Sequence, residues 1–354
     1  MEKNKLILNL SNNQIVHSYN KIKLVEIIFI RAFCSMGILL FHYFCHSNSN
    51  LKFFFKTANS TWGFMFTTTF FCISGSVLYF NYPKIISLKK YYYKRWKSIY
   101  PAYYICFLYF FFANVFETHK LFYNGHWTKL FYTLIGLDGY LSYRLKTYFI
   151  SGEWFLGAII LIYILYPILL FLININILFI FLITFIGYFL MYKANIFIII
   201  KDMNLFTCII SFCFGIITIK YKRIFYENKI IFCGSLFLLI LFCFIKLNAF
   251  ILIFQLQGFF LYISLIHLGS FIMSKRKLSV IKEISKISYS IFLIHHRLII
   301  NILALYNPFE WYFHVILIPI AILSTILCSL IHSKIIEYIF TSCLFKRLDA
   351  FFIN

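Results

Sequence analysis

The sequence predicts an all-α integral membrane protein that crosses the bilayer about ten times. Of its 354 residues, 62% are hydrophobic and only 12% are charged, and the mean hydropathy is +0.85. A soluble domain could not cover that much apolar side chain with so few charges. Long runs, such as residues 161–171, 177–191 and 236–245, have almost no polar interruption. Such runs are typical of helices that cross lipid, where each crossing needs roughly 20 apolar residues.

The apolar runs define one membrane domain, residues 24–332, between a short segment 1–23 and a tail 333–354. A very short break at 174–176 separates two of its helices. The predicted helices lie near residues 24–45, 62–82, 99–116, 153–173, 175–193, 203–219, 230–246, 249–273, 287–306 and 311–332.

The charges between these helices predict their orientation, because Lys and Arg accumulate on the cytoplasmic side. Counting Lys and Arg minus Asp and Glu, one set of segments carries +17 and the opposite set only +3. The basic set comprises residues 1–23, 81–98, 220–229, 274–286 and 333–354. Both termini are therefore predicted to be cytoplasmic, and residues 117–152 form the one sizeable outer loop.

Charge and cysteine content argue against two kinds of partner. The formal net charge is +22, but no basic stretch is interleaved with solvated polar sequence, so nucleic acid is not expected. The ten cysteines are scattered, mostly through apolar segments, and include no C-x-x-C pair. This pattern supports neither a zinc site nor a redox dithiol, and we expect no metal.

The first predicted span carries two residues that are costly in lipid. Arg31 lies well inside it, and such an arginine needs a partner or an aqueous cavity. His42 is eleven residues further on, which places both on nearly the same face, roughly 16 Å apart along the axis. A lone His42 would be interpreted as an interfacial histidine. With Arg31 on the same stripe, the pair instead indicates a functional site, with the imidazole toward the outside.

A basic and aromatic cluster precedes the third predicted span. Topology alone would explain it, because cytoplasmic loops are basic and span ends are aromatic. A phosphate-rich ligand is the alternative, since Arg binds phosphate bidentately and aromatic rings stack on a base. The cations of the cluster are Lys89, Lys90, Lys94, Arg95 and Lys97, among Tyr91, Tyr92, Tyr93 and Trp96.

Five motifs occur in order through about residues 24–332. The first is the spacing Arg31-x10-His42 itself. The others are Phe70-Phe71-Cys-Ile-Ser74-Gly75-Ser76, Lys94-Arg95-x4-Tyr100-Pro101-x-Tyr103, Trp154-Phe155-Leu156-x6-Tyr163-x3-Pro167 and Ser288-Tyr289-x-Ile-Phe292-Leu293-Ile-His295. Together these motifs resemble the acyltransferase-3 family of bacterial membrane acyltransferases.

The resemblance implies an acyl-CoA donor, usually acetyl-CoA, and acceptor hydroxyls on cell-envelope or capsular polysaccharides at the bacterial inner membrane. It implies that Arg31 and His42 are essential, and that the loop with Lys94 and Arg95, which Lys97 adjoins, contacts the donor. The chain departs from the family pattern where many members carry a Glu shortly after the tryptophan, because Ala158 and Ile159 stand there. No carboxylate role is therefore carried over.

Five further residues are candidates for the substrate cavity. Ser288 and His295 are seven residues apart and share a helix face, while interhelical hydrogen bonding is the structural alternative for His295. Trp154 is interpreted first as a packing aromatic. The full set is Ser74, Trp154, Ser288, Tyr289 and His295.

A neutral imidazole such as that of His42 suits a general base that activates a sugar hydroxyl near neutral pH. Two other function classes remain. A transporter or flippase of polysaccharide or lipid-linked sugar would also be basic and polytopic, but it should show paired repeats, and none is evident. A catalytically inactive scaffold would leave Arg31 and His42 without a reason to stand in lipid.

Overall fold

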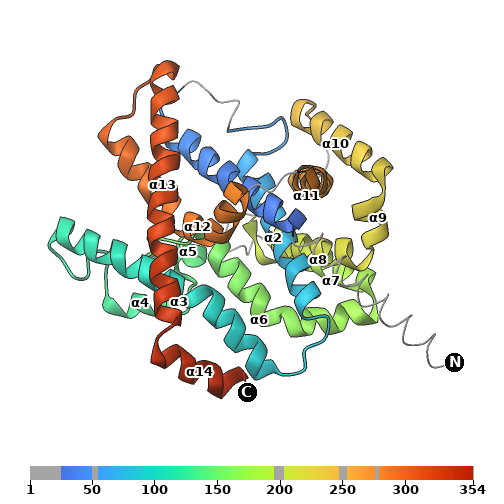
Figure 1. Ribbon diagram of the computed structural model, residues 1–354, viewed down its shortest axis with the longest axis horizontal. Helices are drawn as coiled ribbons and strands as arrows, with labels where there is room; N and C mark the ends of the chain where they lie inside the picture. Colours follow the sequence, from blue (N-terminus) through green and yellow to red (C-terminus); the bar gives the residue numbers. More distant parts are fainter. Residues whose placement is uncertain (1–24, 50–54, 195–202, 247–252, 276–278, 354) are drawn as a thin grey trace.

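A computed structural model of the protein describes residues 25–49, 55–194, 203–246, 253–275 and 279–353, and it is helical almost throughout (Figure 1). The first helix spans Val25–His46. The others are α2 (Trp62–Asn81), α3 (Leu88–Thr118), the 3-10 turn η2 (Trp127–Lys129), α4 (Leu130–Leu134), α5 (Asp138–Leu141), α6 (Glu153–Ile175), α7 (Ile177–Ala194), α8 (Leu205–Lys220), α9 (Lys222–Glu227), α10 (Lys229–Phe244), α11 (Ile253–Lys275), α12 (Ser279–Leu305), α13 (Trp311–Phe340) and α14 (Cys343–Ile353).

The predicted class, an all-α polytopic membrane protein, is confirmed. Within the described residues, eight helices are long and apolar enough to cross a membrane, and α8 and α10 are shorter apolar helices. The predicted break between the fourth and fifth helices is also present, since α6 ends at Ile175, α7 begins at Ile177 and Asn176 lies between them. The number of crossings and the side of each terminus stay predictions.

The basic cluster 89–97, predicted as a loop, is helical. α3 begins at Leu88, eleven residues before the predicted start at 99, and the Ser87 side chain accepts a hydrogen bond from the backbone N–H of Lys90. Hydropathy marks where a chain enters lipid, whereas a helix ends where its backbone is capped. The prediction therefore missed the part of the helix that precedes the apolar stretch.

The same difference appears near the C-terminus. α12 begins at Ser279 instead of 287, α13 runs on to Phe340, and the tail 333–354 contains the further helix α14.

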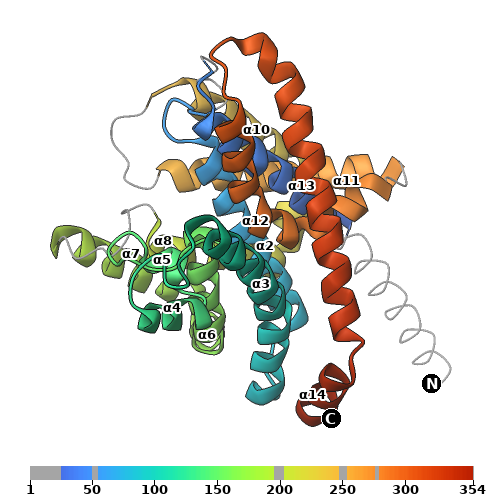
Figure 2. The ribbon, with the colours of Figure 1, turned by 90° about the vertical axis from the view of Figure 1, so that its left-hand side faces the viewer.

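α14 lies beside the first turns of α3, as Figure 2 shows. Its Asp349 accepts hydrogen bonds from Lys97 Nζ at 2.6 and 2.8 Å and from the Tyr93 hydroxyl at 2.8 Å. The bonds from Lys97 and Tyr93 lower the pKa of Asp349.

Small residues bring α2 and α8 into close contact. A Cβ atom added at Gly75 would lie 2.0 Å from the Phe212 carbonyl oxygen, and one added at Gly215 would lie 2.0 Å from the Cys72 carbonyl oxygen. The Ser76 hydroxyl donates to the Gly215 carbonyl at 2.7 Å. Small residues and interhelical hydrogen bonds are what hold helices together in lipid, where hydrophobic burial contributes little. This contact fixes the rotation of α2 about its axis, and therefore the direction in which Ser74 faces.

Hydrogen bonds join segments that the loop charges assign to the same side of the membrane. The Asn48 backbone N–H donates to Asn307 Oδ1 at 2.8 Å, and Asn59 Nδ2 donates to the Ile245 carbonyl at 2.7 Å. At the opposite ends of the helices, Lys286 pairs with Glu337 at 2.7 Å. The described contacts therefore agree with the alternation of the predicted topology.

Asp138 organises the predicted outer loop. It is 1% exposed and accepts hydrogen bonds from the Tyr103 hydroxyl at 2.9 Å, from the Thr133 hydroxyl at 3.2 Å and from the Gly139 N–H at 2.9 Å. Burial raises the pKa of this carboxyl to about 6, although these bonds act in the opposite direction. The bond from Tyr103 anchors the loop to α3.

The first testable prediction is the topology. A reporter fused after residue 88 should be cytoplasmic, and a reporter fused at Gly125 should be outside, because the +17 and +3 segments alternate along the chain. Enzymatic reporters that are active on only one side of the membrane measure this directly. The reverse pattern would overturn the predicted orientation.

A second prediction concerns Asp138 and pH. Because its pKa is higher in the folded protein than the ordinary value of 3.8, the folded state loses stability through this group as pH rises from 3.8 through about 6. Between pH 5 and 7 this amounts to about 1 kcal/mol. Thermal unfolding in detergent should therefore show wild type losing more stability over that interval than Asp138→Asn. Equal losses would contradict the assignment.

Candidate active site

A cavity of about 260 Å³ lies among five helices in the interior of the protein. It is bounded by the helix Val25–His46, α2, α3, α6 and α12, which are distant in the sequence. Its polar lining comprises Arg31, Thr67, Ser74, Arg95, Ser98, Tyr163, Ser288 and Tyr289. Apolar side chains, among them Phe70, Phe155 and Phe292, close the rest of the wall. This composition is typical of a ligand site, where a few polar groups are set in an apolar wall.

Two guanidinium groups line this cavity, and no acidic side chain of the described residues does. The sequence required a partner or a cavity for Arg31, and the structure provides the cavity. Arg95 lies over the rings of Tyr82 and Tyr163, with its central carbon 5.5 and 5.6 Å from their centroids. Its buried Nε has no hydrogen-bond partner among the described residues. A cavity with two cations and no counter-charge from its own walls is suited to an anionic ligand.

The other two cations predicted to bind the donor do not line the cavity. Lys97 is held by Asp349 of α14, as described above. The Nζ atom of Lys94 lies 6.0 Å from the centroid of the Tyr82 ring. Of the three predicted residues, the structure therefore brings only Arg95 together with Arg31.

His42 lies one helical turn beyond Ile38, which lines the cavity. Its ring centroid is 5.0 Å from that of His295 and 4.7 Å from that of His296, both on α12. His295 is completely buried, and its Nδ1 is 3.0 Å from the Ile291 carbonyl oxygen, so Nδ1 carries the proton. Its Nε2 then has a free lone pair and no hydrogen-bond partner among the described residues. Two imidazoles are thus assembled at the end of the cavity remote from Arg95.

Glu153 is a residue of this site to which no role was assigned from the sequence. Its Oε1 forms an ion pair with Nδ1 of His296. Glu153 also has a positive φ of 47°, directly after Gly152 at 90°. A non-glycine residue in this region is strained, and such strain is concentrated at functional sites. The one usable signal was a carboxylate at the start of an apolar span, beside the tryptophan of the fourth motif.

Three of the five cavity candidates line the cavity around Arg31. They are Ser74 on α2 and the neighbours Ser288 and Tyr289 on α12. The Tyr289 hydroxyl donates to the Ile99 carbonyl at 3.1 Å, which ties α12 to α3 across the cavity wall. His295 lies next to His42 and outside this lining, as described above.

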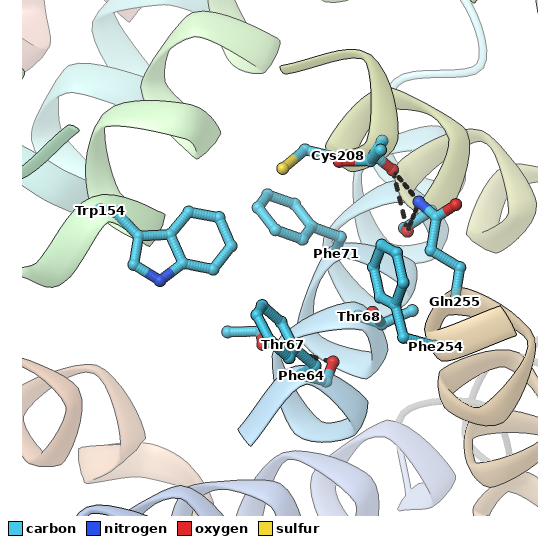
Figure 3. A pocket seen from close by; sticks show the side chains of 10 residues that line it. Phe64, Thr67, Thr68, Phe71, Trp154, Cys208, Phe254 and Gln255 are labelled. Atoms are coloured by element: carbon cyan, nitrogen blue, oxygen red, sulfur yellow. Dashed lines mark hydrogen bonds between the residues drawn. The ribbon is translucent and has the colours of Figure 1, made fainter. Parts of the chain in front are cut away.

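Trp154 faces a different and much smaller cavity. Figure 3 shows its indole opposite Phe71, with Cys208 and Gln255 on the far side. The space is about 10 Å³, enough for about one water molecule. Gln255 Nε2 donates there to the Thr207 carbonyl at 2.5 Å. The surroundings of Trp154 are those of a packing residue that fixes α6 against α2.

The site combines two kinds of chemical group, arginines in the cavity and histidines beyond one end of it. Arg31 and Arg95 can hold or polarise a ligand that carries negative charge or a carbonyl oxygen. His42 and His295 can accept a proton from a hydroxyl group brought to the other end. A reaction between an anionic donor and a weak hydroxyl nucleophile would use both.

A family model of an acyltransferase domain matches residues 24–334 of this chain. The match covers most of the sequence and includes all the helices that bound the cavity. Neither a comparison with curated proteins nor one with solved structures finds a match. The family model favours acyl transfer over the transporter alternative. On this evidence the chain belongs to the acyltransferase-3 family and is a multi-pass membrane acyltransferase.

Proposed function

We propose that the protein transfers an acyl group, in the first place acetyl, from cytoplasmic acyl-CoA to a sugar hydroxyl of a cell-envelope or capsular polysaccharide. The observation that carries the proposal is the cavity with two arginines and no acid, which adjoins His42 and His295. Acyl-CoA supplies the phosphates and the thioester carbonyl that such a cavity suits. The matching location is a bacterial inner membrane, with CoA on one side and envelope glycan on the other.

We expect the two arginines to bind different parts of the acyl-CoA donor. Arg95 lies in the basic first turns of α3, on the side that the loop charges assign to the cytoplasm. We expect it to bind a phosphate of CoA through a charge-assisted contact. Arg31 lies on the same helix as His42, roughly 16 Å before it, and we expect it to hold a polar group of the pantetheine arm. A cavity of about 260 Å³ suits the narrow acyl-pantetheine arm, with the nucleotide left near the start of α3.

His42 acts as the general base. The acceptor oxygen forms a bond to the thioester carbonyl carbon while its proton passes to His42. The carbon–sulfur bond then breaks, and the proton passes from His42 to the departing thiolate. The products are an O-acyl sugar and the free thiol of CoA. A neutral imidazole suits both proton transfers, because it can accept and return a proton near neutral pH.

His295 and Glu153 support this base from two sides. His295 presents an unpartnered Nε2 beside His42, so it can accept a hydrogen bond from a protonated His42 or from the substrate. Glu153 holds His296, which packs against His42 from the same helix as His295. The carboxylate thereby positions the imidazole group.

The direct test of the activity is mass spectrometry of envelope glycans from cells with and without the protein. One acyl mass per repeat unit should disappear with the protein, and its value distinguishes acetyl from larger groups. Glycans of identical mass in both strains would contradict the proposal.

A third prediction concerns the base. His42→Ala and His42→Gln should both lower the acyl-transfer rate by about 10²–10⁴-fold, the usual effect of removing a general base. Glutamine keeps a polar side chain of similar reach but does not titrate near neutral pH, so it should not rescue activity. The measurement is the turnover of acyl-CoA by equal amounts of purified protein.

His126→Ala is the matched control, because His126 is exposed in the outer loop and should leave turnover unchanged. His295→Gln tests the neighbouring imidazole in the same assay. If His42 were only an interfacial histidine, His42→Gln would be active and His42→Ala merely less abundant. Full turnover in a well-expressed His42→Gln protein would therefore refute the assignment.

A fourth prediction separates the cations of α3. Arg95→Ala should raise the KM for acyl-CoA at least about tenfold and leave the KM for the acceptor nearly unchanged, since a charge-assisted phosphate contact contributes about 1.5–3 kcal/mol. Lys94→Ala is the matched control from the adjacent position, outside the cavity lining. Donor titrations of Arg95→Ala that overlay those of wild type would show that the basic cluster is only a topology signal.

A further inference from the structure

Three histidine side chains converge at the end of the first helix that is remote from Arg31. They are His42 and His46 on Val25–His46 and His296 on α12, and their ligating nitrogen atoms all lie within 4.8 Å of one another. His46 is exposed, so this cluster can be reached from outside the protein. From this convergence we propose that His42, His46 and His296 form a binding site for Zn²⁺.

The sequence spacing suits a metal site. His42 and His46 are four residues apart, so they lie one above the other on the same helix face. Two histidines in this helical arrangement commonly ligate zinc. The third ligand, His296, comes from α12, so the three histidines lie together only in the folded protein.

Glu153 orients the third histidine for this role. Its carboxylate holds the Nδ1 atom of His296, which leaves Nε2 facing the cluster. Metal-ligating histidines almost always use the second ring nitrogen in this way, bonded to a carboxylate or a carbonyl. The carboxylate fixes the tautomer and makes the free nitrogen a stronger ligand. This half-buried acidic partner distinguishes the cluster from histidines that merely lie close together on a surface.

The distances between the three nitrogen atoms must adjust when an ion binds. His46 Nε2 and His296 Nε2 are 2.8 Å apart, close enough to share a hydrogen bond. Nitrogen ligands of tetrahedral zinc, each about 2.0–2.1 Å from the ion, are about 3.3 Å from one another. The pair must therefore separate by about half an ångström, which exposed His46 can do by a small rotation. The His42 nitrogen lies within 4.8 Å of the other two and must approach them by up to about 1.5 Å.

The three ligand atoms determine which type of ion the site can bind. Three imidazole nitrogens suit borderline-soft transition metals, whereas Mg²⁺ and Ca²⁺ require oxygen ligands. Three protein ligands leave the fourth tetrahedral position for water or another ligand. Among the divalent ions that bind imidazole, zinc prefers this tetrahedral geometry.

The site has a consequence for catalysis, which rests on the proposed function. A zinc ion bound by His42 occupies the lone pair that would accept the proton of the acceptor hydroxyl. Zinc binding and acyl transfer should then compete for the same nitrogen, so that external zinc acts as an inhibitor.

Binding is tested first, without any activity measurement. The purified full-length protein in detergent is dialysed against buffered zinc, and the bound metal is measured by elemental analysis. We expect one zinc ion per chain, with a Kd raised at least about tenfold in His46→Ala and in His296→Ala. Glu153→Gln should weaken binding by about 10–100-fold through loss of the orienting carboxylate. His126→Ala is the control that should bind as wild type does.

Failure to bind stoichiometric zinc in the wild-type protein would overturn the proposal. So would wild-type affinity in both His46→Ala and His296→Ala. Because His46 is exposed, His46→Ala should fold, and an unchanged elution volume on gel filtration verifies that it does.

Activity is tested second and separates the two proposals. Zinc should inhibit acyl-CoA turnover at the concentration at which it binds, and His46→Ala should need at least about tenfold more zinc for half-inhibition of its own zinc-free rate. Binding without inhibition would support the metal site and contradict His42 as the base. Absence of binding would overturn the metal site and leave the base assignment unaffected.

Discussion

The constraint on which the rest of this structure depends is the cost of placing a cation within a membrane-spanning helix. Arg31 stands well inside such a helix and requires an environment that lipid does not offer. The protein meets this requirement with a cavity bounded by five helices, into which a second arginine, Arg95, also faces. In the part of the chain that the structure describes, no acid of the cavity wall neutralises them. The missing negative charge is therefore expected from a ligand, which is the basis for assigning this cavity to the donor.

The position of Glu153 follows from the same reasoning. Had Glu153 been placed beside Arg31, it would have neutralised the cavity and weakened its attraction for an anion. It lies instead with His296, at the start of α6. Positive charge is thus kept unpaired where the donor is expected, and negative charge is kept beside the imidazoles. The two ends of the site differ in their chemistry because Glu153 lies at only one of them.

The sequence predicted the class of fold, the short break before α7, and a special role for Arg31 and His42. Each rests on local information, either the hydropathy of a run or the spacing along one helix. The pairing of Glu153 with His296 joins α6 to α12, and one sequence does not show which faces of two distant helices meet. His46 was missed for a related reason. Its spacing from His42 was visible, but its significance depends on the third histidine.

The basic start of α3 shows why charge counts overstate the number of ligand-binding cations. Lys89 Nζ donates to the Phe351 carbonyl and Lys90 Nζ to the Ile353 carbonyl, each at 3.0 Å. The last carbonyls of a helix have no partner within it, so these lysines satisfy the C-terminal end of α14.

Lys97 likewise forms an ion pair with Asp349 of α14. Arg95 differs from these lysines because its position on α3 turns it inward, toward Tyr163 and the cavity. The basic residues 89–97 therefore fall into two groups, according to the face of α3 on which each residue lies. Its outer face docks the C-terminal helix, and its inner face supplies the cation expected to hold the donor. Since adjacent residues on a helix point in different directions, the division could be recognised only once this segment was known to be helical.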